Sequence, residues 1–451
     1  MPETASILSS HQRYSEKEEE EDVKEQLNIP KILVIFANNI LSDFIVGLPF
    51  AIQSAGLCVG ILFLLLSALM IDYSLRIIIL TANQLELDTY QAVIEKTLGR
   101  PGFYILTVIN FGYPFLTQVG HNILMGDTIT KIIRRGFRVS SDSIFADRNF
   151  IVFLVTVLVT LPLSLYRKLS QLSRMSFISL LALLSVAVFV IVRAVTMSDI
   201  KVSRNYFSPS SLTRVAISFA ILACGFNVLH ISFMMHRSLK NPTLKRWNMV
   251  SHLSVGGSCL VFLMVGLAGF FTFGDATQGD LLENYCLTDD WGNAVRFTFA
   301  VMIMLVYPTE CFASREVIQN TFYRDKEDNC LRHTVITVLL VALAFLFSTL
   351  TDSFEIPLQV NGILTSIPLA YVLPALTYIR TEQGRLLSPR KLPAMVLVLL
   401  GCIGMICGTV ATILEISNNV ICNNDAEMLY CKENGLFSIA NATEPTNETF
   451  Y

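Results

Sequence analysis

Long apolar segments alternate with short polar connections along most of the chain. Each segment is close to the roughly 20 residues that a helix needs to cross the hydrocarbon core of a bilayer. We expect eleven such spans, at residues 31–55, 57–81, 103–130, 149–166, 173–193, 213–236, 249–274, 294–313, 333–352, 357–380 and 391–417. The pattern therefore predicts an all-α integral membrane protein with one membrane domain, residues 31–417.

Polar segments flank this domain at both ends. Residues 1–30 include the run Glu16–Asp22, EKEEEED, which cannot bury enough apolar surface to offset the entropy of folding. We expect a disordered cytosolic segment there. Residues 418–451 contain two N-glycosylation acceptor sequences, at Asn441 and Asn447, and are expected to lie on the extracellular or lumenal side. An odd number of spans places the two ends on opposite sides, in agreement with both expectations.

Cysteines give a second signal in the same tail. Cys422 and Cys431 bracket a polar stretch, a spacing compatible with a local disulfide in an oxidising compartment. Cys286 lies in another predicted outer connection and is a rival partner. Most of the remaining cysteines stand in or beside apolar segments, where a free thiol behaves as a small hydrophobic group. We therefore expect a disulfide between Cys422 and Cys431, with Cys286 as the alternative.

Basic residues test the topology because Lys and Arg collect in cytosolic connections. The predicted cytosolic connections hold Arg167, Lys168, Arg174, Arg237, Lys240, Lys245, Arg246, Arg315, Arg324, Lys326, Arg332, Arg380, Arg385, Arg390 and Lys391. The predicted outer connections near 275–293 and 352–356 are acidic and contain no Lys or Arg. One connection disagrees: 131–148, predicted outside, carries Lys131, Arg134, Arg135, Arg138 and Arg148.

Composition narrows the class of function. Hydrophobic residues make up 53% of the chain and charged residues 15%, unlike a soluble domain of this length. The net charge of −3 provides no basic field to attract nucleic acid, so the lipid bilayer is the expected environment. The chain also lacks the common catalytic motifs and a cysteine pair at zinc spacing, so we expect neither an enzyme nor a metal site. Nothing in the pattern indicates an oligomeric state.

Two predicted spans contain residues that interrupt helices. The first has Ser42-Asp43-Phe44 followed by Gly47-Leu-Pro49, and the sixth has Ala223–Asn227 followed by His230. A spanning helix is broken only where protein or a water-filled cavity satisfies the freed peptide groups. Because five spans separate the two interruptions, we expect an inverted repeat in which spans one to five resemble spans six to ten, with a binding site where the breaks meet.

Several longer stretches resemble a known family. They are Asp88–Gln91, Gly99–Gly102, Gly126–Thr128, Leu161–Arg167, Thr277–Cys286, Tyr307–Phe312, Arg315–Ile318 and Asn361-Gly-Ile. Together they resemble the sodium-coupled neutral amino acid transporters of the amino acid/auxin permease group. The resemblance implies a LeuT-like fold of five plus five spans and an eleventh, a cytosolic N-terminus, and a neutral amino acid as substrate. It also implies a plasma membrane location, or an endolysosomal one, and coupling to Na⁺, with H⁺ as the other possible ion and no further cofactor.

The family motif points to particular residues around the two breaks. The implied substrate-binding residues are Asn38, Ser42, Asp43, Gly47, Cys224, Gly225, Phe226, Asn227 and His230, and the implied ion-binding residues are Asn38 and Asp43. The family's usual sodium ligands, an Asn of the first span and a Thr of the eighth, align with Ile35 and Val306. Sodium prefers oxygen ligands, which these side chains lack. The family's Gly-Ser-Gly aligns with Ser42-Asp43-Phe44, so bulk and charge replace open backbone.

Asp43 has three interpretations. It could titrate or bind an ion and so couple a cation to transport, it could bind the amino group of a substrate, or it could cap a helix end. If Asp43 only caps a helix end, the altered ion ligands at Ile35 and Val306 favour an alternative function. In that alternative the chain is an amino acid sensor that keeps the fold without transporting.

Three further polar positions carry expectations. Asp72 and Arg76 stand four apart in the second span and are expected to pair on one helix face. Glu310 lines the cavity or holds Arg315, with the structural role favoured. His230 is a hydrogen-bonding residue of the cavity or a proton carrier.

Overall fold

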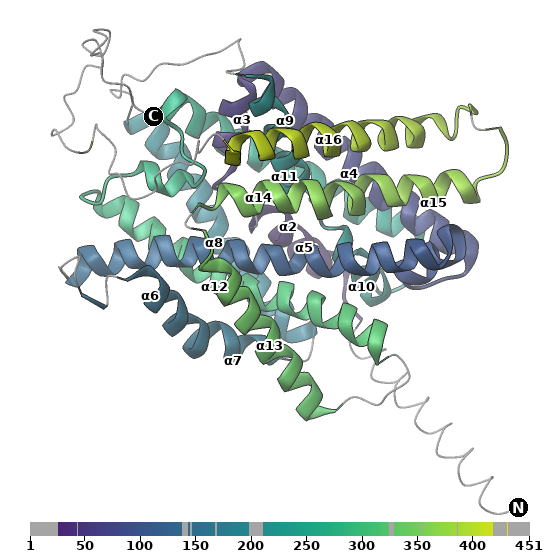
Figure 1. Cartoon of the computed structure of the whole chain (residues 1–451), viewed down its shortest axis with the longest axis horizontal. Coiled ribbons are helices and arrows are strands. Elements are labelled where there is room, and N and C mark those ends of the chain that lie inside the picture. Colours follow the sequence, from purple (N-terminus) through teal and green to yellow (C-terminus); the bar gives the residue numbers. More distant parts are fainter. Residues whose placement is uncertain are drawn as a thin grey trace, which may run out of the picture.

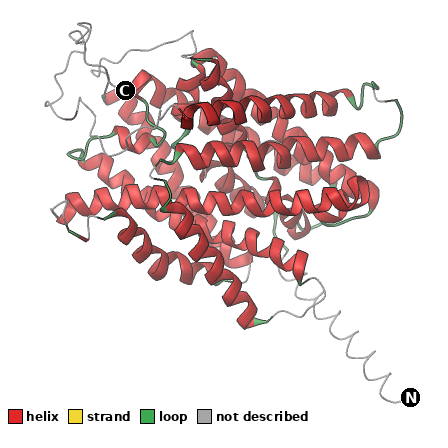
Figure 2. Cartoon of the chain, viewed as in Figure 1, coloured by secondary structure: helices red, strands yellow, loops and turns green. Residues whose placement is uncertain are grey.

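The computed structural model describes residues 26–42, 44–137, 143–144, 147–166, 169–197, 211–323, 329–351, 353–385, 387–417 and 431. Within these residues the fold is helical, and β-structure is confined to an isolated bridge between Leu27 and Leu239 (Figures 1 and 2). The first elements are α2 (Ile29–Ser42), α3 (Leu48–Ala55), α4 (Leu57–Leu85), α5 (Tyr90–Phe137), α6 (Arg148–Val155), η2 (Thr156–Thr160), α7 (Leu161–Ser164) and α8 (Leu169–Thr196). They are followed by α9 (Leu212–Gly225), η3 (Leu229–Ile231), α10 (Ser232–Ser238), α11 (Leu244–Phe273), η4 (Gly274–Ala276), η5 (Leu281–Asn284) and α12 (Asp290–Phe322). The last elements are α13 (Cys330–Ser348), α14 (Glu355–Asn361), η6 (Gly362–Ser366), η7 (Pro368–Val372), α15 (Leu373–Thr381) and α16 (Leu392–Ser417).

Every predicted apolar segment falls on helix. Among the described residues, 8 helices are long and apolar enough to cross a membrane, and Ile29–Ser42 and Arg148–Ser164 are shorter apolar helices. The third segment belongs to α5, which is 48 residues long and is kinked at Gly99, where φ is 75°. That φ lies in the left-handed region that glycine adopts at little cost, so the glycine separates the start of α5 from its long apolar part.

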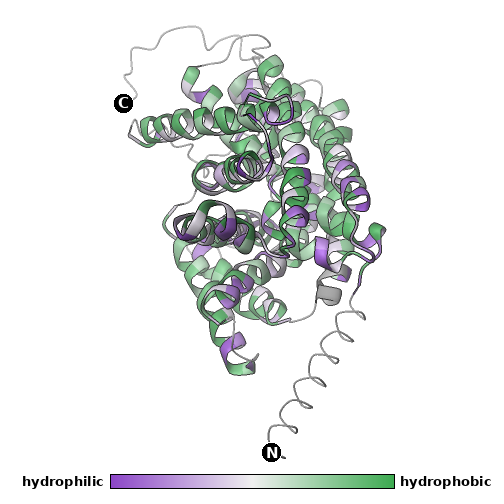
Figure 3. Ribbon diagram, turned by 90° about the vertical axis from the view of Figure 1, so that its right-hand side faces the viewer, coloured by the Kyte–Doolittle hydropathy of each residue, from purple (hydrophilic) through white to green (hydrophobic). Residues whose placement is uncertain are grey.

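Burial separates central helices from peripheral ones. The segment Leu212–Ser238 contains α9 and α10, and 83% of its most apolar 18-residue stretch is buried. The corresponding share in Cys330–Ser348 is 28%. Large apolar side chains such as Leu69 and Val188 instead point outward, and hydrophobic residues cover the outer helices (Figure 3). A shell of exposed apolar residues is what a lipid environment requires, and the broken sixth span lies inside it.

The helices define two ends of the molecule. At one end, α11 leads into the segment 274–289 and then α12; we call this the disulfide end, because it holds Cys286. At the other, the connection 382–391 joins α15 to α16, at the right of Figure 1; we call this the loop end. Trp247 Nε1 donates to the Leu75 carbonyl at 2.9 Å and brings the start of α11 beside the second half of α4, also at the loop end.

Candidate functional site

The predicted break in the first span is present. Helices α2 and α3 are separated by a turn at residues 44–47. Pro49 has no N–H to donate, so it suits the first turn of α3 and not a helix interior. The Val46 carbonyl accepts a hydrogen bond from Leu281 N–H at 3.0 Å, so a distant segment satisfies a group that the break frees. Asp43 lies outside the described residues, and its three interpretations stay predictions.

The predicted break in the sixth span is also present. Around the C-terminal end of α9, the Cys224 and Asn227 carbonyls both accept from the Tyr113 hydroxyl, at 3.3 and 3.0 Å. Ser366 Oγ donates to the Ala223 carbonyl at 2.8 Å. Because a peptide carbonyl left unpaired in hydrocarbon costs several kcal/mol, these hydroxyls from α5 and η6 allow the helix to open here.

Phe44 joins the two breaks. A Cβ atom on Gly225 would lie 2.3 Å from Phe44 Cδ1, and one on Gly47 would lie 3.4 Å from Phe44 Cε2. The rings of Phe44 and Phe226 both meet Phe262 of α11 edge to face, with centroids 5.8 and 5.1 Å apart. Aromatic rings therefore fill the space where the family motif has open backbone, and the Phe44 ring requires glycine at position 225.

A buried acid–base pair lies beside the second break. His230 Nε2 is 3.4 Å from Glu310 Oε2, and the two side chains are 1% and 0% exposed. The ring of Tyr113 lies 4.7 Å from the ring of His230, centroid to centroid. The hydroxyl that closes the broken helix and the histidine therefore belong to one polar group of α5, η3 and α12. Sequence reasoning favoured a purely structural role for Glu310 and did not pair it with His230.

The candidate ion ligands of α2 are buried. Asn38 is inaccessible, and neither atom of its amide has a hydrogen-bond partner among the described residues. Ile35 and Val306 are 1% and 0% exposed, so apolar side chains occupy the positions of the family's sodium ligands. Ser42 is also buried and its Oγ donates to the Asn39 carbonyl at 3.3 Å. In the described part of the chain, His, Cys, Asp and Glu form no cluster of three that could hold a metal ion.

A small pocket reaches the polar group from the loop end. Its volume is about 30 Å³, enough for a water molecule, and its lining includes His230 and Asn110. Tyr90, Arg237 and Glu316 line it further out. This opening gives water a route toward His230 from one end of the molecule.

The other end is covered by residues 274–289, which we call the lid segment. Gln278 N–H donates to Asn284 Oδ1 at 2.9 Å, and Asn284 Nδ2 donates to the Ala276 carbonyl at 2.8 Å, so the segment is internally bonded. Gly279 lies so close to Glu355 of α14 that a Cβ atom would stand 2.0 Å from the Glu355 side chain. With the bond from its own Leu281 to the first break, the lid segment closes the site at the disulfide end.

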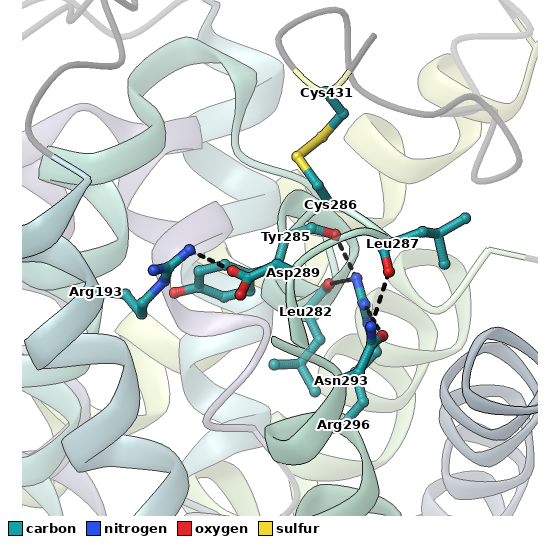
Figure 4. The surroundings of a disulfide bond; sticks show 9 residues. All are labelled: Arg193, Leu282, Tyr285, Cys286, Leu287, Asp289, Asn293, Arg296 and Cys431. Atoms are coloured by element: carbon teal, nitrogen blue, oxygen red, sulfur yellow. Dashed lines mark hydrogen bonds and ion pairs between the residues drawn. A yellow bond between two sulfur atoms is a disulfide. The ribbon is translucent and has the colours of Figure 1, made fainter. Parts of the chain in front are cut away.

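Arg296 of α12, the helix that follows the lid segment, anchors that segment. Its guanidinium is 1% exposed and donates to the Leu282 carbonyl at 2.9 Å, to Asn293 Oδ1 at 2.7 Å and to the Tyr285 carbonyl (Figure 4). Burial raises the pKa of Asp280 in the lid segment above its usual range, against the lowering effects of the Leu282 N–H hydrogen bond and of Lys131 and Arg296.

The same region contains several of the basic residues that disagreed with the predicted topology. Several of them lie on α5 or just after it and pair with acids at the disulfide end. The ion pairs are Lys131–Glu283, Arg135–Asp290 at 3.3 Å, Arg148–Asp127 at 2.6 Å and, from α8, Arg193–Asp289. The charge rule counts Lys and Arg whatever acids lie beside them, so these pairs give the basic residues partners without accounting for the departure from the rule.

The expected disulfide between Cys422 and Cys431 is wrong. Cys431 is bonded to Cys286 of the lid segment, with Cα atoms 5.5 Å apart (Figure 4). Nine-residue spacing favoured the local pair, but Cys431 lies beside the lid segment, where Cys286 is its partner. Cys422, Asn441 and Asn447 lie outside the described residues, so glycosylation stays a prediction.

Sequence reasoning missed two residues of the site. Tyr113 and Ser366 supply the hydroxyls that satisfy the broken sixth span. Pro114, directly after the tyrosine, and Pro368, two residues after the serine, mark irregular backbone near both positions, and this was the available signal. Spacing alone does not show which distant carbonyl a hydroxyl reaches.

Comparison with known proteins agrees with this geometry. Residues 25–414 match the family model described as transmembrane amino acid transporter protein. The chain is 35% identical over 409 residues to "Putative sodium-coupled neutral amino acid transporter 11" of Danio rerio, covering 90% of each protein. It is 27% identical over 404 residues to vacuolar amino acid transporter 2 of Saccharomyces cerevisiae, covering 85% of this chain and 82% of that one.

A solved structure shows the same fold. MHP1, a nucleobase-cation-symport-1 family transporter in a closed conformation with bromovinylhydantoin bound, superposes with a TM-score of 0.58 at 10% identity. The match covers 90% of this chain and 95% of MHP1, whose fold is LeuT-like. MHP1 thus shows the fold, and the family model together with the Danio rerio relative shows that the chain belongs to the transmembrane amino acid transporter family.

Proposed function

We propose that the chain is a secondary transporter that moves neutral amino acids across a membrane by alternating access. The observation that carries the proposal is the meeting of two broken helices inside the fold, closed at the disulfide end and reached by a pocket at the loop end. Transporters of this architecture bind substrate between such half-helices and expose it to one side at a time. The names of the relatives support amino acids as the substrate class.

The proposal includes eleven spans, as five plus five and one more. The 8 long apolar helices, the two shorter ones and the apolar part of α5 support this number. With the acidic N-terminus in the cytosol, the loop end faces the cytosol and the disulfide end faces the extracellular space or an organelle lumen. The bond between Cys286 and Cys431 supports an oxidising compartment at that end. The plasma membrane remains our first location, and the vacuolar relative supports an endolysosomal membrane as the other.

Cation coupling is the third part of the proposal, and the site favours a proton over sodium. Buried Ile35 and Val306 offer sodium no side-chain oxygen. The His230–Glu310 pair can hold one proton and be neutral overall, whereas loss of that proton leaves one buried negative charge. Because an uncompensated charge is costly inside a membrane protein, release of the proton requires water to reach the pair, which alternating access supplies.

Flux in proteoliposomes tests the proposal. Purified full-length chain is assayed with a panel of neutral amino acids under a pH gradient, a Na⁺ gradient or neither. We expect a pH gradient to drive accumulation of the amino acid. Glu310→Gln should reduce this accumulation at least tenfold, while exchange of amino acid between equal concentrations on the two sides of the membrane persists. Asp290→Asn on the same helix α12, whose side chain is 85% exposed at the disulfide end and pairs with Arg135 at 3.3 Å, is the control.

Each outcome of this assay bears on one part of the proposal. Accumulation that needs Na⁺ and survives Glu310→Gln rejects proton coupling but keeps transport. Stabilisation of the protein by amino acids without flux or exchange rejects transport and identifies a sensor. Asp43→Asn in the same assay tests its coupling role, because loss of accumulation with exchange retained is expected only for a coupling residue.

A further inference from the structure

A second and larger pocket lies at the loop end, apart from the breaks. Its volume is about 340 Å³, and it opens between α4, α11, α15 and the start of α16. Two arginines, Arg76 and Arg390, line it together with Tyr73, Tyr378 and the amide of Asn248. The remaining lining is apolar. A pocket with two guanidinium groups on an otherwise apolar wall is suited to an anion that carries apolar groups.

Arg76 is available to such an anion. The expected partner, Asp72, accepts a hydrogen bond from Ser251 Oγ at 2.6 Å and lies 2.9 Å from His252 Nδ1. The expected Asp72–Arg76 pair is therefore wrong, because α11 supplies closer partners. Arg76 is exposed and forms no ion pair with any described residue. Its charge faces the pocket without a carboxylate to neutralise it.

The second arginine is only weakly held. Arg390 lies 3.5 Å from Glu382, and its side chain is 81% exposed. An exposed pair of this length contributes little to stability, so a ligand can compete for the guanidinium. Lys391, the next residue, donates to the Ile379 and Gly384 carbonyls at 3.0 and 3.2 Å and adds a fixed positive charge nearby.

The surroundings of the pocket favour a lipid. The amide oxygen of Asn248 is buried and has no hydrogen-bond partner among the described residues, so it can accept from a ligand hydroxyl. Beside the lining residues on the same two helices, Met249 and Leu253 of α11 and Leu392 and Val396 of α16 are exposed and apolar. These positions can contact acyl chains while the arginines bind a phosphate, and charged headgroups of this kind concentrate on the cytosolic leaflet.

We propose that this pocket binds the phosphate-bearing headgroup of an anionic phospholipid. Arg76 and Arg390 bind the phosphate, and a headgroup hydroxyl donates to Asn248. Because the residues come from four helices, the bound headgroup ties the connection 382–391 to α4 and α11. The site is separate from the two breaks, so the inference stands independently of the transported substrate.

Native mass spectrometry of the purified full-length chain tests this inference. The protein is incubated with phosphatidylinositol phosphate, with phosphatidylcholine or with inorganic phosphate. We expect selective retention of the phosphatidylinositol phosphate, and at least tenfold less retention in the double variant Arg76→Gln/Arg390→Gln. Arg100→Gln is the matched control, because Arg100 is exposed at the same end, near the contact between Arg380 and the Thr97 carbonyl, and lies outside the pocket.

Thermal unfolding separates the remaining explanations. The double variant should unfold at the wild-type temperature without lipid and should lose the stabilisation that the anionic lipid gives wild type. Equal retention of phosphatidylinositol phosphate by wild type and the double variant would show that Arg76 and Arg390 do not form the lipid site. Protection by inorganic phosphate equal to that by the lipid would overturn the lipid as ligand and identify a soluble phosphate compound.

Discussion

The two ends of the molecule are held together in different ways. At the disulfide end, the lid segment is bonded to the first break, to buried Arg296 and through Cys286 to the C-terminal tail. At the loop end, two pockets enter between the helices, and Arg76 faces one of them with no carboxylate partner among the described residues. The site is therefore covered by a bonded segment at the disulfide end, whereas pockets enter between the helices at the loop end.

This difference indicates where the free energy of opening lies. To open the disulfide end, the chain must break the hydrogen bonds that hold the lid segment, whereas a pocket large enough for a water molecule already reaches His230 from the loop end. Substitutions at the disulfide end should therefore change the balance between the two conformations most. The following predictions test that comparison, from the largest expected effect to the smallest.

Arg296→Met should have the largest effect. It removes the charged donor from the carbonyls of Leu282 and Tyr285, and hydrogen bonds from a charged donor contribute about 1.5–3 kcal/mol each. We expect a loss of about 3 kcal/mol or more in unfolding free energy, measured by thermal unfolding in detergent. Thr298→Val, at an exposed site on the same helix, should be nearly neutral. Equal stability of the two variants would show that Arg296 does not anchor the lid segment.

Removal of the disulfide should follow. Cys286→Ser opens a link between residues 145 apart and should cost about 2–4 kcal/mol. Cys431→Ser should have the same effect, and a reducing agent should reproduce it in wild type. Cys422→Ser serves as the control and should leave both the stability and the non-reducing peptide map unchanged. A Cys422–Cys431 peptide in that map would contradict the structure.

Gly225→Ala tests the contact between the breaks. The added Cβ would stand 2.3 Å from the Phe44 ring, and overpacking of this kind costs about 1–3 kcal/mol. Phe44→Ala should remove most of the cost in a double variant, as a double-mutant cycle would show. Gly257→Ala on α11, where a Cβ meets nothing within 4 Å, should be tolerated. If Gly225→Ala is equally destabilising in the Phe44→Ala background, the contact with the Phe44 ring is not the cause of the lost stability.

Asp280 should give the smallest effect, seen as pH dependence. Burial raises the pKa of this carboxyl in the folded chain above 3.8, so the folded state binds the proton more tightly than the unfolded state. Its contribution to stability is therefore greatest at acidic pH and falls as pH rises through the raised pKa. Asp280→Asn keeps the acceptor for Leu282 N–H and should remove this dependence. A constant difference in unfolding temperature between wild type and variant across pH would contradict the shift.

Local patterns in the sequence sufficed for the helices and their breaks. Gly47-Leu-Pro49 favours an interruption in an apolar segment because proline cannot donate a backbone hydrogen bond, and the first break lies there. The apolar segments likewise predicted helix positions, because length and hydropathy decide what can span a bilayer.

Contacts between distant residues could not be predicted in the same way. Asp72 and Arg76 fit a helix pair, but Ser251 and His252 of another helix lie closer to the acid. Phe44 was expected to add bulk at the first break, yet its partner Gly225 emerges only when the two breaks are brought together. In each case the local sequence fits the expected contact, but the three-dimensional path of the chain determines which distant residue lies beside Asp72 or Phe44.

The bond between Cys286 and Cys431 also makes part of the molecule a covalent ring. The ring contains α12, α13, α14, α15 and α16, with the connections between them. A single cut by a protease in any of those connections leaves both fragments in one molecule until the bond is reduced. Four of the eleven proposed spans are thus protected from dissociation by one bond at the disulfide end.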